Sequence, residues 1–199
     1  CQVFRALDEG CAAEVLSNPK GHIVIDDGRR FLKRTPLKFD VIATDPPPPL
    51  QAAGSSLLYS TEFCELIKEH LNPHGIAQLW LPGGDRMADV AVMRSVYSSF
   101  PYVRSFPSIS RGGVHLLASM EPVARRSPEE LLARMPASAK QDLLEWAGNT
   151  NAVAYLGSVI SYEVPTEKLL NPDPKIRVTD DLPYNEYFLL RNRRLFFSP

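Results

Sequence analysis

Apolar residues along the chain recur in two patterns, short runs and spacings of three or four, with polar turns between them. The runs are typical of strands and predict them at residues 22–26, 39–44, 76–81, 102–106 and 114–119. The wider spacings predict helices at residues 2–17, 29–34, 61–71 and 87–100. Ser60 is the expected N-cap of the helix at 61–71. Strands that alternate with helices predict a parallel sheet with right-handed crossovers up to about residue 120.

The composition changes after residue 120. Ser127 and Glu130 form a capping-box pattern around Pro128, which predicts a helix start. The later pattern predicts helices near 128–135 and 138–147, an apolar stretch at 152–160 that fits either a helix or a strand, a loop at 163–183, and a partial strand at 186–197. Residues 121–199 therefore read as a helical and loop extension.

Composition excludes several classes of protein. A net charge of −1 over 199 residues gives no reason to expect nucleic acid as a partner. No run approaches the roughly 20 apolar residues that span a bilayer. The three cysteines lack metal-ligand spacing, so we expect reduced thiols and no metal site. The first residues read as the middle of a helix, so we expect a fragment whose upstream segment carries further motifs or a membrane anchor.

Asp27 and Gly28 directly follow the apolar run at 22–26. A carboxylate in this place can accept a hydrogen bond from the exocyclic amine of a bound base, and glycine lets the backbone approach a ligand closely. Asp-Gly is also among the commonest turn dipeptides, so a plain turn is the alternative.

Asp45 follows the predicted strand 39–44 and precedes four consecutive prolines. In open α/β sheets, ligands bind beyond the carboxyl ends of the strands, which is where this carboxylate falls. Prolines at 46–49 form a rigid wall without amide donors. Asp45 could therefore take a proton from an amine nucleophile or hold a cationic substrate. The alternative is a solvated loop aspartate.

A third acidic group consists of Asp180, Asp181 and Glu186. Folded back over the strand ends, it would add negative charge for a polyamine. A capped surface turn is the alternative.

Four segments together resemble the spermidine synthase family, the polyamine aminopropyltransferases: HIVIDDGRRFL, FDVIATDPPPP, AAGSSLLYSTEFCELIKEHLNPHGIAQLW and TDDLPYNEYF. The chain is most similar to bacterial spermidine-synthase-like members, which are often fused to membrane segments. The resemblance implies a Rossmann-like α/β fold of the class I methyltransferase type, with a mostly parallel sheet and helices on both faces. Residues 1–120 would be the C-terminal part of that nucleotide-binding transferase domain, and 121–199 would pack on it as the extension.

The resemblance also implies a reaction. An aminopropyl group would pass from decarboxylated S-adenosylmethionine to putrescine and release methylthioadenosine, with no metal and no tightly bound cofactor. Asp27 and Gly28 would contact the adenine, and Asp45 would contact the nucleotide and accept the amine proton. Tyr59 and Asp181 would bind the substrate. A polyamine substrate, a homodimer and a place in the cytoplasm or on the cytoplasmic face of a membrane are further implications.

Two departures from the family pattern keep alternatives open. Pro48 stands where the family has a second aspartate, and the glycine-rich turn with its ribose-binding acid is expected upstream of Cys1. One alternative is a methyltransferase that uses S-adenosylmethionine itself. Another is a catalytically silent module that binds a nucleotide or a polyamine.

Overall fold

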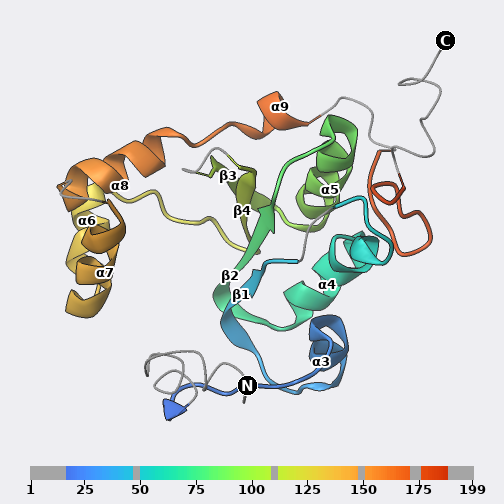
Figure 1. The fold of residues 1–199 in the computed structure, drawn as a ribbon, viewed down its shortest axis with the longest axis horizontal. Coiled ribbons are helices and arrows are strands. Elements are labelled where there is room, and N and C mark those ends of the chain that lie inside the picture. The colour runs from blue at the N-terminus through green and yellow to red at the C-terminus, as the bar shows by residue number, and fades with distance from the viewer. Residues whose placement is uncertain (1–16, 47–49, 109–111, 148–150, 171–175, 188–199) are drawn as a thin grey trace, which may run out of the picture. The chain divides into compact units, whose positions relative to one another are not determined.

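The computed structural model describes residues 17–46, 50–108, 112–147, 151–170 and 176–187 (Figure 1). The chain divides into two compact units, Cys1–Arg34 and Thr35–Pro199, and each is described by itself. The helix predicted at 2–17, the prolines at 47–49 and most of the strand predicted at 186–197 lie outside the described residues.

The described part of the first unit contains helix α3 (Gly28–Arg34), which confirms the helix predicted at 29–34. Asp27 caps it, since its side chain accepts a hydrogen bond from the backbone amide of Arg30 at 2.8 Å. The strand predicted at 22–26 is wrong. These residues have no strand pairing and are exposed, with Ile25 at 92%. An apolar run makes a strand only where a neighbouring strand supplies hydrogen bonds, and no described strand pairs here.

The second unit is built on a four-stranded sheet in the order β1-β2-β4-β3. Its strands are β1 (Phe39–Thr44), β2 (Leu71–Leu81), β3 (Tyr102–Pro107) and β4 (Val114–Ser119). β2 is parallel to β1, while β4 is antiparallel to both β2 and β3. Three strands therefore run the same way and β4 alone is reversed. This confirms the Rossmann-like α/β fold and the expected antiparallel pairing of the last two strands, while the described sheet is mixed, with one parallel and two antiparallel pairings.

Two helices connect these strands and cover one face of the sheet. α4 (Thr61–Glu69) joins β1 to β2, and α5 (Arg86–Ser99) joins β2 to β3. Ser60 caps α4 by accepting a hydrogen bond from the Phe63 amide, as predicted. Asp85 caps α5, with its Oδ1 atom accepting from two backbone amides. Caps of this kind stabilise a helix by about 1 kcal/mol.

The core lies between this face and the two helices. The strands contribute every second side chain, including Ala77, Leu79, Leu81, Leu116 and Ala118, all at most 1% exposed. Opposite them lie small and β-branched residues of α5, such as Ala88, Ala91, Val92 and Val96, which let the helix approach the sheet closely. The alternation expected of a half-buried strand is clear in β2. β1 is more exposed than its apolar run predicted, with Val41 at 60%.

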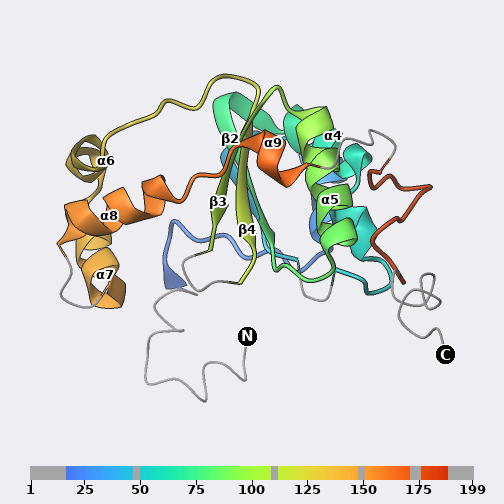
Figure 2. The same cartoon turned by 90° about the horizontal axis from the view of Figure 1, so that it is seen from above.

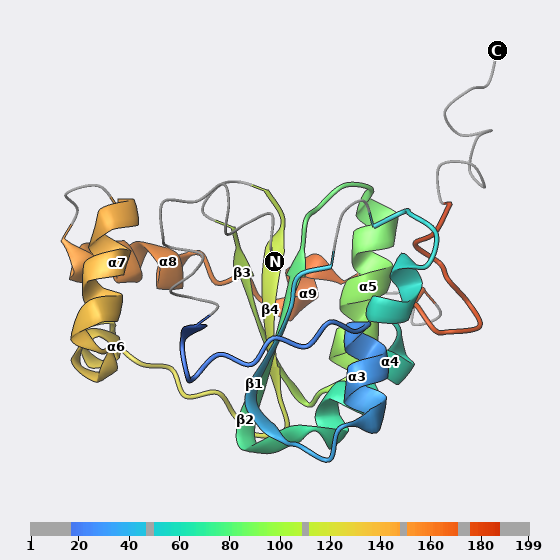
Figure 3. The same cartoon turned by 60° about the horizontal axis from the view of Figure 1, so that its bottom comes forward.

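The C-terminal extension contains α6 (Pro128–Arg134), α7 (Ala137–Ala147), α8 (Ala152–Ser161) and the short α9 (Thr166–Leu169). The capping box at Ser127 is present, as predicted. The ambiguous stretch at 152–160 is a helix, and the loop predicted at 163–183 includes α9. α6 and α7 pack against α8. Figures 2 and 3 show α4 and α5 on one face of the sheet and α6–α8 on the other.

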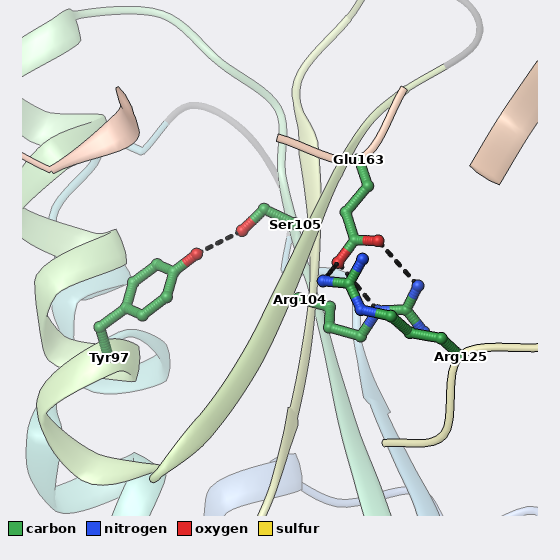
Figure 4. Close-up of polar contacts among 5 residues, drawn as sticks. All are labelled: Tyr97, Arg104, Ser105, Arg125 and Glu163. Atoms are coloured by element: carbon green, nitrogen blue, oxygen red, sulfur yellow. Dashed lines mark hydrogen bonds and ion pairs between the residues drawn. The ribbon is translucent and has the colours of Figure 1, made fainter. Parts of the chain in front are cut away.

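Ion pairs attach the end of α8 to the sheet (Figure 4). Glu163 accepts two hydrogen bonds from Arg104 on β3, at 3.0 and 2.8 Å, and pairs with Arg125 at 3.1 Å. The hydrogen bonds with Arg104 lower the pKa of Glu163. The backbone amide of Val164 also donates to the Ser105 carbonyl at 2.9 Å. A groove of about 1050 Å³ lies between this side of the sheet and α8, floored by Ile76 and Leu117.

Candidate functional site

Asp45 lies at the carboxyl end of β1 and is exposed. The residue before it, Thr44, is paired in register with Leu79 of β2. Since β1 and β2 are parallel, the segments that follow them leave the sheet at the same edge. The turn after β2, Pro82–Asp85, is therefore a neighbour of Asp45 by topology. This is the edge at which open α/β sheets bind ligands.

Tyr59 lies between a short 3₁₀ helix (Ser55–Leu58) and α4, and its side chain is only 1% exposed. Burial raises the pKa of the Tyr59 hydroxyl above its ordinary value, and the negative charges of Asp45 and Asp89 raise it further. The phenol therefore stays neutral and can donate a hydrogen bond. The charges of Asp45 and Asp89 therefore both act on the hydroxyl of Tyr59.

Asp89 was not anticipated as a site residue from the sequence. It lies in the first turn of α5, where its Oδ2 atom accepts a hydrogen bond from the Gly84 amide at 3.2 Å. Its Oδ1 atom is buried and has no hydrogen-bond partner among the described residues. Burial raises the pKa of Asp89 to about 6, the Gly84 amide lowers it, and the nearby charge of Asp85 raises it. The sequence feature that could have pointed to Asp89 is its position four residues after Asp85, in a segment that follows a strand and two consecutive glycines.

The segment 178–187 folds back onto the loop that follows Asp45. The Ser60 hydroxyl donates to Asp180 at 2.6 Å, and the Asp180 amide donates to Glu62 at 3.0 Å. Glu186 is 7% exposed and accepts hydrogen bonds from Ser56. Two of the three predicted acids are thus engaged in holding the chain together, while Asp181 is exposed.

The five predicted site residues fall in both units. Asp27 and Gly28 are exposed in the first unit, where Asp27 caps α3. Asp45, Tyr59 and Asp181 are in the second, and Asp45 and Tyr59 interact electrostatically. The roles assigned to these residues stay predictions.

Some kinds of chemistry find no support among the described residues. No group of three or more His, Cys, Asp or Glu side chains within them could hold a metal ion. Cys64 is fully buried, and burial raises the pKa of its thiol to about 12, so it is a poor nucleophile. In the same part of the chain, no helix is both long and apolar enough to cross a membrane.

Comparison with known proteins gives consistent results. Residues 1–80 match the spermine/spermidine synthase domain. Polyamine aminopropyltransferase 2 of Pseudomonas aeruginosa is 30% identical over 109 residues, covering 51% of this chain and 31% of that protein. The polyamine aminopropyltransferase of Sulfurisphaera tokodaii is 43% identical over 51 residues, covering 26% and 17%. The chain thus spans less than a third of the length of these relatives.

Solved structures were compared in the same way. Spermidine synthase from Thermotoga maritima matches with a TM-score of 0.49 and 17% identity, covering 84% of this chain and 54% of that one. Human methyltransferase-like protein 13, in complex with SAH, matches with a TM-score of 0.47 and 21% identity, covering 56% and 55%.

The sheet, with its parallel strands and single reversed strand, defines a Rossmann-like α/β protein. The sequence matches are more specific than this fold class. Residues 1–80 are similar to the spermine/spermidine synthase domain, and the relatives that the chain matches over part of its length are polyamine aminopropyltransferases.

Proposed function

We propose that this protein transfers an aminopropyl group from decarboxylated S-adenosylmethionine to a polyamine acceptor. The observation that carries the proposal is the exposed carboxylate of Asp45 at the carboxyl end of β1, beside the neutral hydroxyl of Tyr59. The similarity of residues 1–80 to the spermine/spermidine synthase domain and to a polyamine aminopropyltransferase supports the type of reaction. Asp27 and Gly28 would contact the adenine of the nucleotide.

The chemistry requires a base at the acceptor nitrogen. A protonated amine has no lone pair, so it must lose a proton before its nitrogen attacks the carbon bonded to the sulfonium. The new C–N bond forms as the C–S bond breaks, and methylthioadenosine leaves with the electron pair on sulfur. Asp45 accepts the proton of the attacking nitrogen, because a carboxylate within hydrogen-bond reach can take it directly or through one water.

Two other residues would support this step. The buried side chain of Tyr59 offers no exposed ring face, so it would act through its neutral hydroxyl, on which the charge of Asp45 acts. Asp181 is exposed on the segment that covers the loop after Asp45, where its charge would attract the cationic acceptor.

Replacing Asp45 with asparagine in the full-length protein tests the proposal. Release of methylthioadenosine from decarboxylated S-adenosylmethionine and putrescine should fall about 100-fold or more, the usual range for a lost general base. Asp40→Asn is the matched control. Asp40 lies near the opposite end of the same strand, where it accepts a hydrogen bond from Asn72. An Asp45→Asn variant with the rate of the Asp40→Asn control would refute the role of Asp45.

The same assay separates the proposal from its competitors. S-adenosylmethionine should replace the decarboxylated nucleotide poorly, and methyl transfer without aminopropyl transfer would point to a methyltransferase. No turnover with either nucleotide, in a full-length protein that binds methylthioadenosine, would identify a silent binding module.

A further inference from the structure

The face of the sheet that α4 and α5 do not cover carries apolar side chains that are only half-buried. They line the groove of about 1050 Å³ between the strands and α8, on the side of the sheet where Figure 3 shows α6–α8. Ile76, Phe106 and Leu117 line the groove from the strands, and each of these side chains is half-buried. Apolar surface in this state gains free energy when a further layer covers it.

The opposite wall of the groove is apolar as well. α8 is apolar along most of its length, which is typical of a helix that packs on several sides. In the described structure, however, neither α6 nor α8 contains a buried residue. Leu156, Val159 and Ile160 of α8 line the groove and are half-buried. Two incompletely covered apolar walls therefore lie on either side of the same groove.

The helices that form this second wall belong together. Both α6 and α7 pack against α8. The contact between α6 and α8 is close, since a Cβ atom placed on Gly157 would lie 3.5 Å from the ring of Pro128. We call α6, α7 and α8 together the lid. Because its helices are packed on one another, the lid can move as one body without losing its internal contacts.

The two connections between the lid and the sheet meet at one point (Figure 4). The connection that enters the lid contains Arg125 and the one that leaves it contains Glu163, and their side chains are paired at 3.1 Å. Arg104 of β3 donates two further hydrogen bonds to Glu163. The entering connection, residues 120–127, has no helix or strand. Its backbone can therefore change conformation while the junction at Glu163 stays attached to β3.

We propose that the lid closes the groove by rotating about the junction at Glu163, so that α8 packs on the face of the sheet opposite α4 and α5. The driving force is the removal of both apolar walls from water. The ion pairs of Glu163 supply a fixed axis, because they hold the entering connection, the leaving connection and β3 together. This inference concerns a conformational change and does not depend on the proposed reaction.

Disulfide trapping in the full-length protein tests the closure. Leu117→Cys on β4 and Leu156→Cys on α8 place one thiol on each wall, and a disulfide requires the two Cα atoms to come within about 7 Å. Under mild oxidation this pair should form a disulfide about tenfold faster than Leu117→Cys combined with Leu144→Cys. Leu144 is the matched control, because it lies on α7 and does not line the groove. Mass spectrometry of the linked peptides identifies the bond.

The trapped protein should also have lost the groove. Anilinonaphthalene sulfonate fluoresces on apolar surface, and its binding to the Leu117→Cys/Leu156→Cys protein should fall about twofold or more on oxidation and recover on reduction. Ile76→Cys with Val159→Cys is a second pair across the groove and should give the same result, which covers the case in which Leu117→Cys does not fold.

The junction is tested by removing its negative charge. Glu163→Gln weakens the hold on Arg104 and Arg125, so the lid no longer turns about a fixed axis and trapping should slow about fivefold. Glu145→Gln, at an exposed position on α7, should leave the rate of trapping unchanged.

Each result decides one part of the inference. Equal rates for the groove pair and the control pair would overturn the closure. A disulfide that leaves dye binding unchanged would also overturn it, since the walls would then already touch or another segment or chain would fill the groove. A rate of trapping that Glu163→Gln does not change would overturn the role of the junction.

Discussion

The carboxylate of Glu186 accepts hydrogen bonds from both the amide and the hydroxyl of Ser56, at 3.0 and 2.5 Å, across 130 residues of sequence. The neighbouring Asn185 donates to the Leu50 carbonyl at 2.6 Å and to the Ser55 hydroxyl at 2.9 Å. These contacts tie the segment 178–187 to the loop that follows Asp45. The geometry of the candidate site therefore depends on a segment far along the chain.

Truncating Glu186 should destabilise the protein. Glu186→Ala leaves the buried amide and hydroxyl of Ser56 without this acceptor, at an expected cost of about 2 kcal/mol in the free energy of unfolding. Urea unfolding of the full-length protein measures this cost. Glu145→Ala, at an exposed position on α7, is the control and should change stability by less than about 0.5 kcal/mol. Equal effects of the two substitutions would show that the contact with Ser56 contributes nothing.

The raised pKa of Asp89 predicts a pH-dependent cost to stability. Its pKa rises from 3.8 to about 6 on folding, so between these values the native state holds more protons than the unfolded state. The free energy of unfolding should therefore fall as the pH rises through this range, by about 1 to 2 kcal/mol, because solvent screens this partly exposed carboxylate and reduces the effect below that of the full shift. Urea unfolding from pH 4 to 7.5 should show this fall for the wild-type protein but a smaller one for Asp89→Asn. Identical pH profiles would contradict the burial of this carboxylate.

Gly113 should tolerate no side chain. Its φ is +85°, in the left-handed region, and a Cβ atom would lie 1.9 Å from the carbonyl oxygen of Leu81. Gly113→Ala should cost more than about 3 kcal/mol, because strain and a backbone clash act together. Gly112→Ala is the matched control, since a Cβ atom there meets nothing within 4 Å. Thermal unfolding compares the two, and similar melting temperatures would be inconsistent with the close approach of Gly113 to β2.

Most elements of the second unit could be predicted from local patterns. The strand at Phe39–Thr44 has the predicted bounds, and the start of α4 at Ser60 follows from its cap. The run at 22–26 has equally strong apolar character but forms no strand. Periodicity reports which side chains prefer burial, whereas a strand also needs a hydrogen-bonding neighbour, which no local window contains.

The candidate site was only partly predictable for a related reason. Asp45 is found by its place after a strand, a rule that needs no tertiary information. Asp89 is distinguished by an oxygen without a partner and by its effect on Tyr59, both of which depend on packing. The hydrogen bond between Ser56 and Glu186 likewise joins residues that are 130 positions apart in the sequence. Local sequence patterns therefore could not distinguish this structural acid from one that binds substrate.

The helical extension leaves the sheet after β4 and returns to β3, its neighbour, where Val164 bonds to Ser105 and Glu163 pairs with Arg104. The extension thus begins at one strand and is attached again at the adjacent strand, so both of its ends are fixed to the sheet. The entropic cost of closing such a connection between two fixed ends grows only slowly with its length. Relatives can therefore be expected to gain or lose whole helices between these two attachment points while the strand ends keep their positions.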